Sequence, residues 1–161
     1  MRVAGRRATS LFDGLGINYV LFCQGCKHGC EGCQNPETWS MDGGLEMTVE
    51  EIESDIEKYM PLITGVTFSG GDPVYQLSEV LKLDAWAKAK RLKTTLYTGF
   101  SVTNDKWLSE LPFDYIIDGR FEKSLRTSAC AFRGSKNQNM YQRMEAGYVN
   151  INEKVDGVIK K

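Results

Sequence analysis

A chain of 161 residues with a net charge of −1 and no basic stripe fits one domain and gives no electrostatic basis for binding nucleic acid. Its 42% hydrophobic and 25% charged residues are those of a globular protein, and no apolar run approaches the roughly 18 residues that span a bilayer. No long apolar stretch follows the charged N-terminus, so we expect no signal peptide. These features predict one domain over 1–161 in the cytoplasm, with a loose tail over 154–161.

Short apolar runs that indicate strands alternate with helical patterns along the chain. Thr48 is spaced from Glu51 as in a capping box, which predicts a helix that begins there and ends by Pro61. Alternating strands and helices are typical of a parallel sheet. The predicted strands cover residues 17–22, 63–68, 94–97, 114–117 and 148–151, and the other predicted helices cover 77–91 and 104–110.

The fold class that this order predicts is α/β, with parallel strands in an incomplete, TIM-like βα barrel. The barrel is incomplete because the chain is too short for eight βα units. In the predicted helix over 77–91, apolar spacing selects four candidates for the inner face. These are Val80, Leu81, Ala85 and Trp86.

Turn-forming and polar residues follow four of the predicted strands. The carboxyl ends of parallel strands meet at one edge of a sheet, which is where ligands bind in α/β folds. The four loops are therefore expected to form one site. They are the cysteine loop after residue 22, Gly70-Gly71-Asp72-Pro73, Thr98-Gly99 and Asp118-Gly119-Arg120.

Cysteine usage is the most informative feature of the chain. Four of the five cysteines are clustered and Cys130 stands alone, a pattern that argues against a secreted disulfide framework. Thiolates select zinc or iron–sulfur clusters, but a four-cysteine zinc site normally separates its two CxxC pairs by about a dozen residues or more. The spacing instead favours one loop wrapped around a larger, cuboidal cluster. It is Cys23-x2-Cys26-x3-Cys30-x2-Cys33.

Two ligand sets are compatible with this spacing. All four thiolates could fill every iron of a cluster, as in electron-transfer ferredoxins, whereas Cys26, Cys30 and Cys33 alone would leave the fourth iron open. Cys23 ends an apolar strand, where a buried structural cysteine is common, and this favours the three-cysteine set. His28, the single histidine, lies inside the loop but off the ligand spacing, so we expect it to be solvated.

Several motifs carry a resemblance to known families. Cys26-x3-Cys30-x2-Cys33 after a first strand resembles the signature of the radical S-adenosylmethionine (SAM) superfamily. Further segments resemble the activating component of anaerobic, class III ribonucleotide reductase. They are Asp13-Gly14-Leu15-Gly16, in which Leu15 replaces the usual proline, Cys33-Gln34-Asn35-Pro36-Glu37-Thr38-Trp39, Tyr97-Thr98-Gly99-Phe100, Asp118-Gly119-Arg120-Phe121 and Arg133-Gly134-Ser135-x-Asn137-Gln138.

The resemblance implies a set of site residues. Three cysteines would be the catalytic ligands of one 4Fe-4S cluster whose open iron binds SAM, and a Gly-Gly-Asp segment would receive the methionyl ammonium. For Arg120 and Arg133, binding the SAM carboxylate, docking a partner and an ordinary salt bridge all stay open, and Asn137 and Gln138 could cap a turn. The expected metal ligands are Cys26, Cys30 and Cys33, and the expected cofactor-binding residues are Gly32 through its backbone, Cys33, Gln34, Gly70, Gly71, Asp72, Thr98 and Arg120.

The resemblance also implies a function, that of a glycyl-radical activating enzyme. Reductive cleavage of SAM would give a 5′-deoxyadenosyl radical that takes a Cα hydrogen from a glycine of the reductase. Its partners would be the catalytic subunit of anaerobic ribonucleotide reductase and a one-electron donor such as a flavodoxin-type reductant, with no nucleic acid and no membrane. An activase of another glycyl-radical enzyme, such as pyruvate formate-lyase, is an alternative. A zinc-binding interaction module and a ferredoxin-like electron carrier are alternatives of other classes.

Overall fold

Strands and α-helices, joined by short 3-10 turns, make up the computed structural model, which describes residues 1–159. The strands are β1 (Arg2–Ser10), β2 (Asn18–Cys23), β3 (Leu45–Glu46), β4 (Gly65–Gly70), β5 (Lys93–Tyr97), β6 (Tyr115–Asp118), β7 (Asn139–Met144) and β8 (Gly147–Asn150). The helices are α1 (Val49–Glu57), α2 (Leu77–Ala89) and α3 (Asn152–Ile159). The 3-10 turns cover Pro36–Thr38, Pro73–Gln76, Lys106–Glu110 and Lys123–Leu125.

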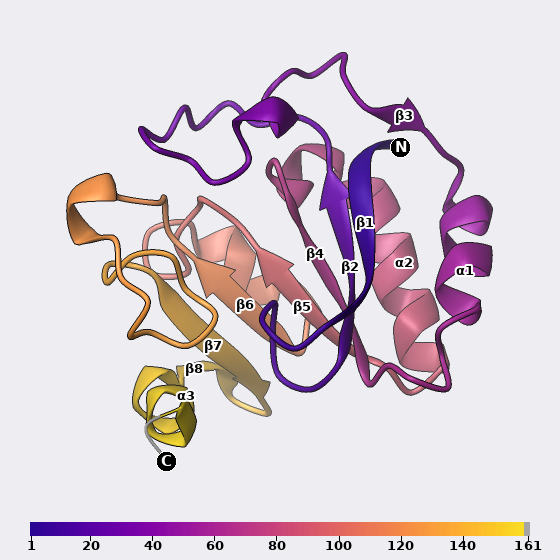
Figure 1. Cartoon of the computed structure of the whole chain (residues 1–161). Coiled ribbons are helices and arrows are strands. Elements are labelled where there is room, and N and C mark those ends of the chain that lie inside the picture. The colour runs from indigo at the N-terminus through magenta and orange to yellow at the C-terminus, as the bar shows by residue number, and fades with distance from the viewer. Residues whose placement is uncertain (160–161) are drawn as a thin grey trace.

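The strands form one sheet, in the order β3-β1-β2-β4-β5-β6-β7-β8 (Figure 1). The four central strands β2, β4, β5 and β6 run parallel, whereas β1, β3, β7 and β8 pair antiparallel with their neighbours. The predicted α/β class with parallel strands is confirmed. Within the described residues β3 and β8 are the two edges of the sheet, so the barrel is incomplete, as the chain length predicts.

Helices α1 and α2 pack together against the sheet, and α3 lies beside β7 at its other end (Figure 1). The predicted capping box begins α1, because the Thr48 side chain accepts the N–H of Glu51 and the Glu51 carboxylate accepts the N–H of Thr48. Helix α3 covers residues up to 159 of the expected loose tail, and Lys160 and Lys161 lie outside the described residues. No helix in the described part of the chain has the length and apolarity to cross a membrane.

The inner face of α2 differs from the predicted one. Val80 is fully buried as expected, but Ala85 is exposed, and Leu81 and Trp86 are only partly buried against the core. The actual face follows the spacing i, i+3, i+4, i+7 from Val80. A buried aspartate interrupts this apolar stripe, so the apolar residues alone do not mark the buried face. The buried residues are Val80, Leu83, Asp84 and Ala87.

Three strands were not predicted, namely β1, β3 and β7. Strand β1 contains three arginines and a glycine, so its side chains show no clear apolar alternation. Its pairing with β2 depends on backbone hydrogen bonds that a side-chain pattern does not reveal. The same holds for β7, which adds an antiparallel strand beside β6.

Alternation along β2 decides which residues face the functional side. Tyr19, Leu21 and Cys23 point into the core cluster that also contains residues of α1 and α2. Phe22 points to the opposite face of the sheet, where it lines a cavity. The chain therefore enters the cavity wall directly after the carboxyl end of β2, while the side chain of Cys23 lies in the core.

Candidate functional site

A cavity of about 940 Å³ lies at the carboxyl ends of the parallel strands. Residues from all four predicted loops line it, so these loops do share one edge of the sheet. Of the predicted site residues, Gly32 and Asp72 are not among the lining residues of the described chain. Those that do line it are Cys26, Cys30, Cys33, Gln34, Gly70, Gly71, Thr98 and Arg120.

The cysteine loop is closed on itself at its base. The N–H of Gly25 donates to the carbonyl of Thr38 at 2.7 Å, and the N–H of Cys26 donates to the carbonyl of Trp39 at 3.1 Å. The buried Thr38 hydroxyl donates to the carbonyl of Asn35 at 2.7 Å, which fixes the 3-10 turn that brings the chain back. The Asn-x-x-Thr-Trp segment after the last cysteine is thus the structural closure of the loop.

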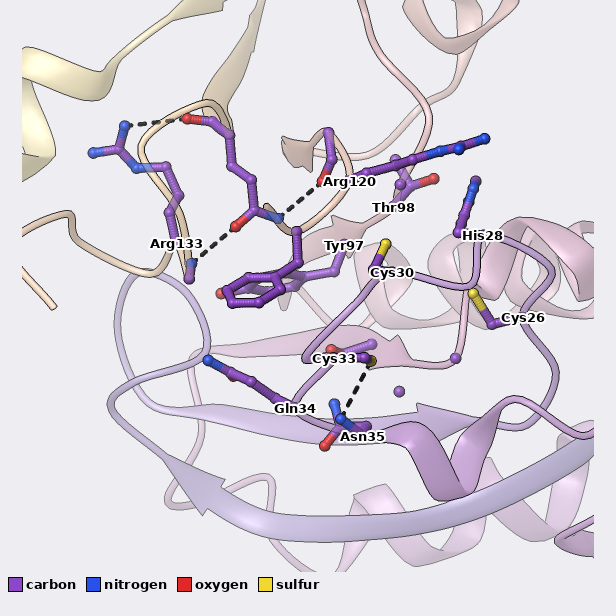
Figure 2. A pocket seen from close by; sticks show the side chains of 18 of the residues that line it. Cys26, His28, Cys30, Cys33, Gln34, Asn35, Tyr97, Thr98, Arg120 and Arg133 are labelled. Atoms are coloured by element: carbon purple, nitrogen blue, oxygen red, sulfur yellow. Dashed lines mark hydrogen bonds between the residues drawn. The ribbon is translucent and has the colours of Figure 1, made fainter. Parts of the chain in front are cut away.

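Three cysteines of this loop face the cavity and fit an iron–sulfur cluster. Cys26, Cys30 and Cys33 are partly exposed free thiols around one hollow (Figure 2). Within the described residues no three Cys, His, Asp or Glu side chains converge closely enough to hold a single ion. A cuboidal cluster presents its irons at separate corners, so three thiolates that each meet a different iron suit it. Burial raises the pKa of the Cys26 thiol, although a backbone hydrogen bond from His28 opposes this effect.

Cys23 lies apart from these three thiols. Its side chain is fully buried in the core with Tyr19 and Leu21, and burial strongly raises the pKa of its thiol. The predicted burial of Cys23 is confirmed, and its structural role stays a prediction. Cys130, in the loop before β7, is a partly exposed free thiol that does not line the cavity.

Gly70 and Gly71 let two backbone segments approach each other closely. The N–H of Gly71 donates to the carbonyl of Cys23 at 2.8 Å. A Cβ atom on Gly71 would lie 2.4 Å from the carbonyl oxygen of Gly25, and one on Gly70 would lie 2.6 Å from the backbone of Cys23. Gly70 also has a φ of +101°, which side chains disfavour. Because Gly70 and Gly71 have no side chains, the loop after β4 can pack directly against the cysteine loop. The two glycines also expose backbone atoms to the cavity.

The carboxylate of Asp72 is occupied by the protein's own donors. Oδ1 accepts the N–H of Val74 at 3.0 Å, and Oδ2 accepts the Thr98 hydroxyl and the N–H of Gly99, both at 2.9 Å. Oδ2 also lies 2.6 Å from Nε2 of His28. Asp72 is only 1% exposed. Asp72 does not itself line the cavity, and its carboxylate belongs to a network that links three loops. Its assignment to the ammonium of SAM stays a prediction.

His28 is not the solvated residue that its position predicted. Its side chain is only 5% exposed, and its ring meets the ring of Phe100 edge-on at 4.9 Å between centroids. No local pattern indicates this burial, since the partner carboxylate and the aromatic ring come from loops 44 and 72 residues further along the chain. The contact exists because the loops after β2, β4 and β5 meet at one edge of the sheet.

Arg120 and Arg133, whose roles the sequence left open, have different environments. Arg133 is buried and forms an ion pair with Asp156 of α3, while its Nε donates to the carbonyl of Ala131 at 3.2 Å. Arg120 is exposed at the cavity, and within the described chain its guanidinium has no ion pair (Figure 2). Arg133 lines the cavity but is already held by an ion pair, whereas the Arg120 guanidinium is available to a ligand.

Asn137 and Gln138 brace the loop that carries Arg120. The amide of Asn137 donates to the carbonyl of Arg120 at 2.8 Å, and the amide of Gln138 donates to the carbonyl of Gly119 at 2.9 Å. The Gln138 side-chain oxygen accepts the N–H of Gly134 at 2.9 Å. These amides connect the Asp-Gly-Arg and Arg-Gly-Ser segments.

A family model described as "4Fe-4S single cluster domain" matches residues 12–141. The anaerobic ribonucleoside-triphosphate reductase-activating protein of Enterobacteria phage T4 is 38% identical over 141 residues, which is 83% of this chain and 88% of that protein. The chain belongs to the family of these activating proteins. The protein of the same name from Vibrio cholerae serotype O1 is 33% identical over 145 residues, covering 81% of this chain and 90% of that protein. The resemblance to radical SAM activating enzymes is thereby confirmed.

A second group of relatives is similar over a shorter segment. The pyruvate formate-lyase-activating enzyme of Clostridium pasteurianum is 42% identical over 89 residues, which is 51% of this chain and only 37% of that enzyme. The similarity to the reductase-activating proteins extends over most of both chains, whereas this one covers a shared part.

Aromatic side chains form part of the cavity wall, and motif spacing alone did not place them there. Phe22 lies next to the end of β2 and Tyr97 ends β5, the two strands on either side of β4. The Tyr97 hydroxyl donates to the carbonyl of Phe132 at 2.8 Å. Strand alternation was the signal that could have identified Phe22, since it must face away from Cys23. The other aromatic residues of the wall are Phe12, Trp39, Phe121 and Phe132.

We expect Arg133→Leu to lower the free energy of unfolding of the apo-protein by about 2 kcal/mol, because it removes a buried guanidinium that bonds to Asp156 and to the carbonyl of Ala131. Urea unfolding followed by circular dichroism measures this loss. Arg120→Leu is the matched control and should change stability by no more than about 0.5 kcal/mol, as usual for an exposed residue. Equal losses in the two variants would contradict a stabilising role for Arg133.

Proposed function

We propose that this chain is a radical SAM activating enzyme that introduces a glycyl radical into an anaerobic ribonucleoside-triphosphate reductase. The observation that carries the proposal is the similarity to reductase-activating proteins over more than four fifths of the chain, at 38% and 33% identity. The shorter match to pyruvate formate-lyase-activating enzymes supports the same class of chemistry and makes the reductase the better candidate for the partner.

The residues that would hold the cluster are Cys26, Cys30 and Cys33. They are the cysteines of one loop whose thiols line the cavity, while Cys23 is enclosed in the core. When bound, a 4Fe-4S cluster with one open iron and SAM supply the reductive cleavage of a carbon–sulfur bond that generates a 5′-deoxyadenosyl radical. The chain's contribution is to fix three thiolates and leave space beside them for a ligand and for a segment of the partner.

The cavity wall suits a charged cofactor and a radical reaction. Backbone groups of Gly70 and Gly71 are exposed to the cavity and can accept or donate hydrogen bonds to the methionyl part of SAM. We assign Arg120, the exposed guanidinium beside the cavity, to the carboxylate of SAM, since guanidinium binds carboxylates with two parallel hydrogen bonds. Phe22 and Tyr97 give the wall an apolar part that excludes water from a reactive intermediate.

The partner must reach this cavity with a polypeptide segment. A glycine is a suitable target because its Cα has no side chain to block access. The one-electron donor that reduces the cluster belongs to the same proposal, and we expect a flavodoxin-type reductant at the exposed side of the cysteine loop. Lys27 and Glu31 are exposed there.

A two-part experiment tests the proposed function. The anaerobically reconstituted protein is treated with dithionite and SAM, and 5′-deoxyadenosine is measured. The same mixture is then examined by electron paramagnetic resonance, in one sample with the anaerobic reductase subunit and in another with pyruvate formate-lyase. We expect 5′-deoxyadenosine and a glycyl radical on the reductase, with no radical on pyruvate formate-lyase.

Each alternative gives a different result in this experiment. A zinc module would be colourless, and an electron carrier would be brown but would not cleave SAM. A radical on pyruvate formate-lyase instead of the reductase would assign the chain to the other group of activases.

A further inference from the structure

One side chain of the cysteine loop is held by the rest of the fold in a way that the proposed chemistry does not require. His28 stands midway between Cys26 and Cys30, and it is the buried side chain of that span, since Lys27 and Gly29 are exposed. His28 lines the same cavity as Cys26 and Cys30 (Figure 2). A histidine that is solvated in the loop would not have this burial, so its position needs a separate explanation.

The slot that holds the His28 ring is matched to it in shape. The ring of Phe100 meets it edge-on at 4.9 Å, and the ring of Tyr75 lies 6.0 Å away on another side. A Cβ atom on Gly99 would lie 2.5 Å from the imidazole, so Gly99 leaves the space that the ring fills. The slot is built by the loops after β4 and β5, neither of which carries a cysteine.

The polar end of the ring is fixed as well. Its Nε2 lies 2.6 Å from Oδ2 of Asp72, whose carboxylate is held in turn by the Thr98 hydroxyl and by the N–H groups of Val74 and Gly99. Four partners make this buried carboxylate a rigid anchor at the end of β4. Any group bonded to it is therefore fixed relative to the sheet.

We propose that His28 is a positioning residue for the iron–sulfur cluster. Anchored on Asp72, its side chain fixes the path of the chain between Cys26 and Cys30, and so the placement of these two thiols before the cluster binds. The acidic residue of the Gly-Gly-Asp segment then acts on the cysteine loop through His28. This inference rests on the proposed cluster site, and partners that orient metal ligands commonly change metal affinity roughly 10-fold to 100-fold when removed.

Three variants of His28 test whether the hydrogen bond to Asp72 is needed, or only a side chain that fills the slot. In His28→Gln the side-chain amide nitrogen can reach the place of Nε2 and donate to Asp72. In His28→Asn it is one methylene too short to do so. His28→Phe keeps an aromatic ring against Phe100 without the hydrogen bond. Glu31→Gln is the control in the same loop, because it removes only the exposed contact with Lys123.

The readouts are the melting temperature of each apo-protein, iron and sulfide per chain after anaerobic reconstitution and a chelator challenge, and the electron paramagnetic resonance spectrum of the reduced cluster. We expect His28→Asn and His28→Phe to retain roughly 10-fold less cluster, with an altered spectrum, while their apo-proteins stay folded. His28→Gln should recover most of the cluster, and Glu31→Gln should match the unchanged protein. If one of the weakened variants does not fold, the other is compared with His28→Gln.

The outcomes distinguish this inference from the proposed function. Cluster retention and spectra that are equal in His28→Asn, His28→Phe and the unchanged protein would overturn the positioning of the thiols by His28 and leave the proposed function intact. A His28→Gln protein that loses as much cluster as His28→Asn would overturn it too. An unchanged protein that takes up no iron would overturn the proposed function and this inference together.

Discussion

Cys26→Ala is expected to abolish the iron–sulfur cluster and the cleavage of SAM, whereas Cys23→Ala is expected to retain both. The two variants should differ because Cys23, at the end of β2, points into the core, whereas Cys26, in the loop after β2, faces the cavity. Cys26 lines the cavity, and without its thiolate one iron of the cluster has no protein ligand. Cys23 points into the core, so its loss removes one buried sulfur and costs about 1 kcal/mol of stability. Iron content, the absorbance of the reconstituted protein and 5′-deoxyadenosine formation measure the difference.

Cys130→Ala is the control for the cysteine variants, because this thiol is partly exposed and lies outside the cavity. It should load iron and form 5′-deoxyadenosine as the unchanged protein does. Equal loss of the cluster in Cys26→Ala and Cys23→Ala, with Cys23→Ala still folded, would show ligation by four cysteines. That result would favour an electron carrier and contradict the open iron on which the proposed function depends.

Gly71→Ala is expected to disrupt the fold at the base of the site. The added methyl group would lie 2.4 Å from the carbonyl oxygen of Gly25 and 3.0 Å from that of Thr38, which are backbone atoms that cannot turn aside. The loop after β4 must then separate from the cysteine loop, at a cost of roughly 3 kcal/mol. In a domain of this size, that corresponds to a melting temperature lower by about 10 °C. Calorimetry of the apo-protein measures this change, and reconstitution measures the accompanying loss of the cluster.

Gly5→Ala is the matched substitution for Gly71→Ala. Gly5 lies in β1, where a methyl group would have no atom within 4 Å, and its φ is not in the left-handed region. Its replacement should leave the melting temperature within a few degrees, since a compatible alanine reduces the entropy of the unfolded chain. A Gly71→Ala protein that melts and loads iron like Gly5→Ala would contradict the close docking of the two loops.

Much of the central sheet could be predicted because its signals are local. The apolar runs that became β2, β4, β5 and β6, and the capping box of α1, depend on side chains within one element. Because loops after parallel strands share one edge of a sheet, the cysteines, Gly70 and Arg120 could be predicted to form one site, and they line one cavity. Strands β1 and β7 were missed because they are specified by pairing with β2 and β6, and their own residues lack a clear apolar pattern.

The sequence alone carries the motifs on which the family resemblance rests, because cysteine spacing and the segments after it do not depend on folding. Spacing left open whether three or four thiols bind the cluster. How the polar residues are used depends instead on the folded arrangement. Spacing predicted a SAM contact for Asp72 and a solvated position for His28, and it left the role of Arg133 open. All three bond to residues from distant segments. Buried polar groups take the partners that folding brings to them, and those partners are a property of the assembled loops.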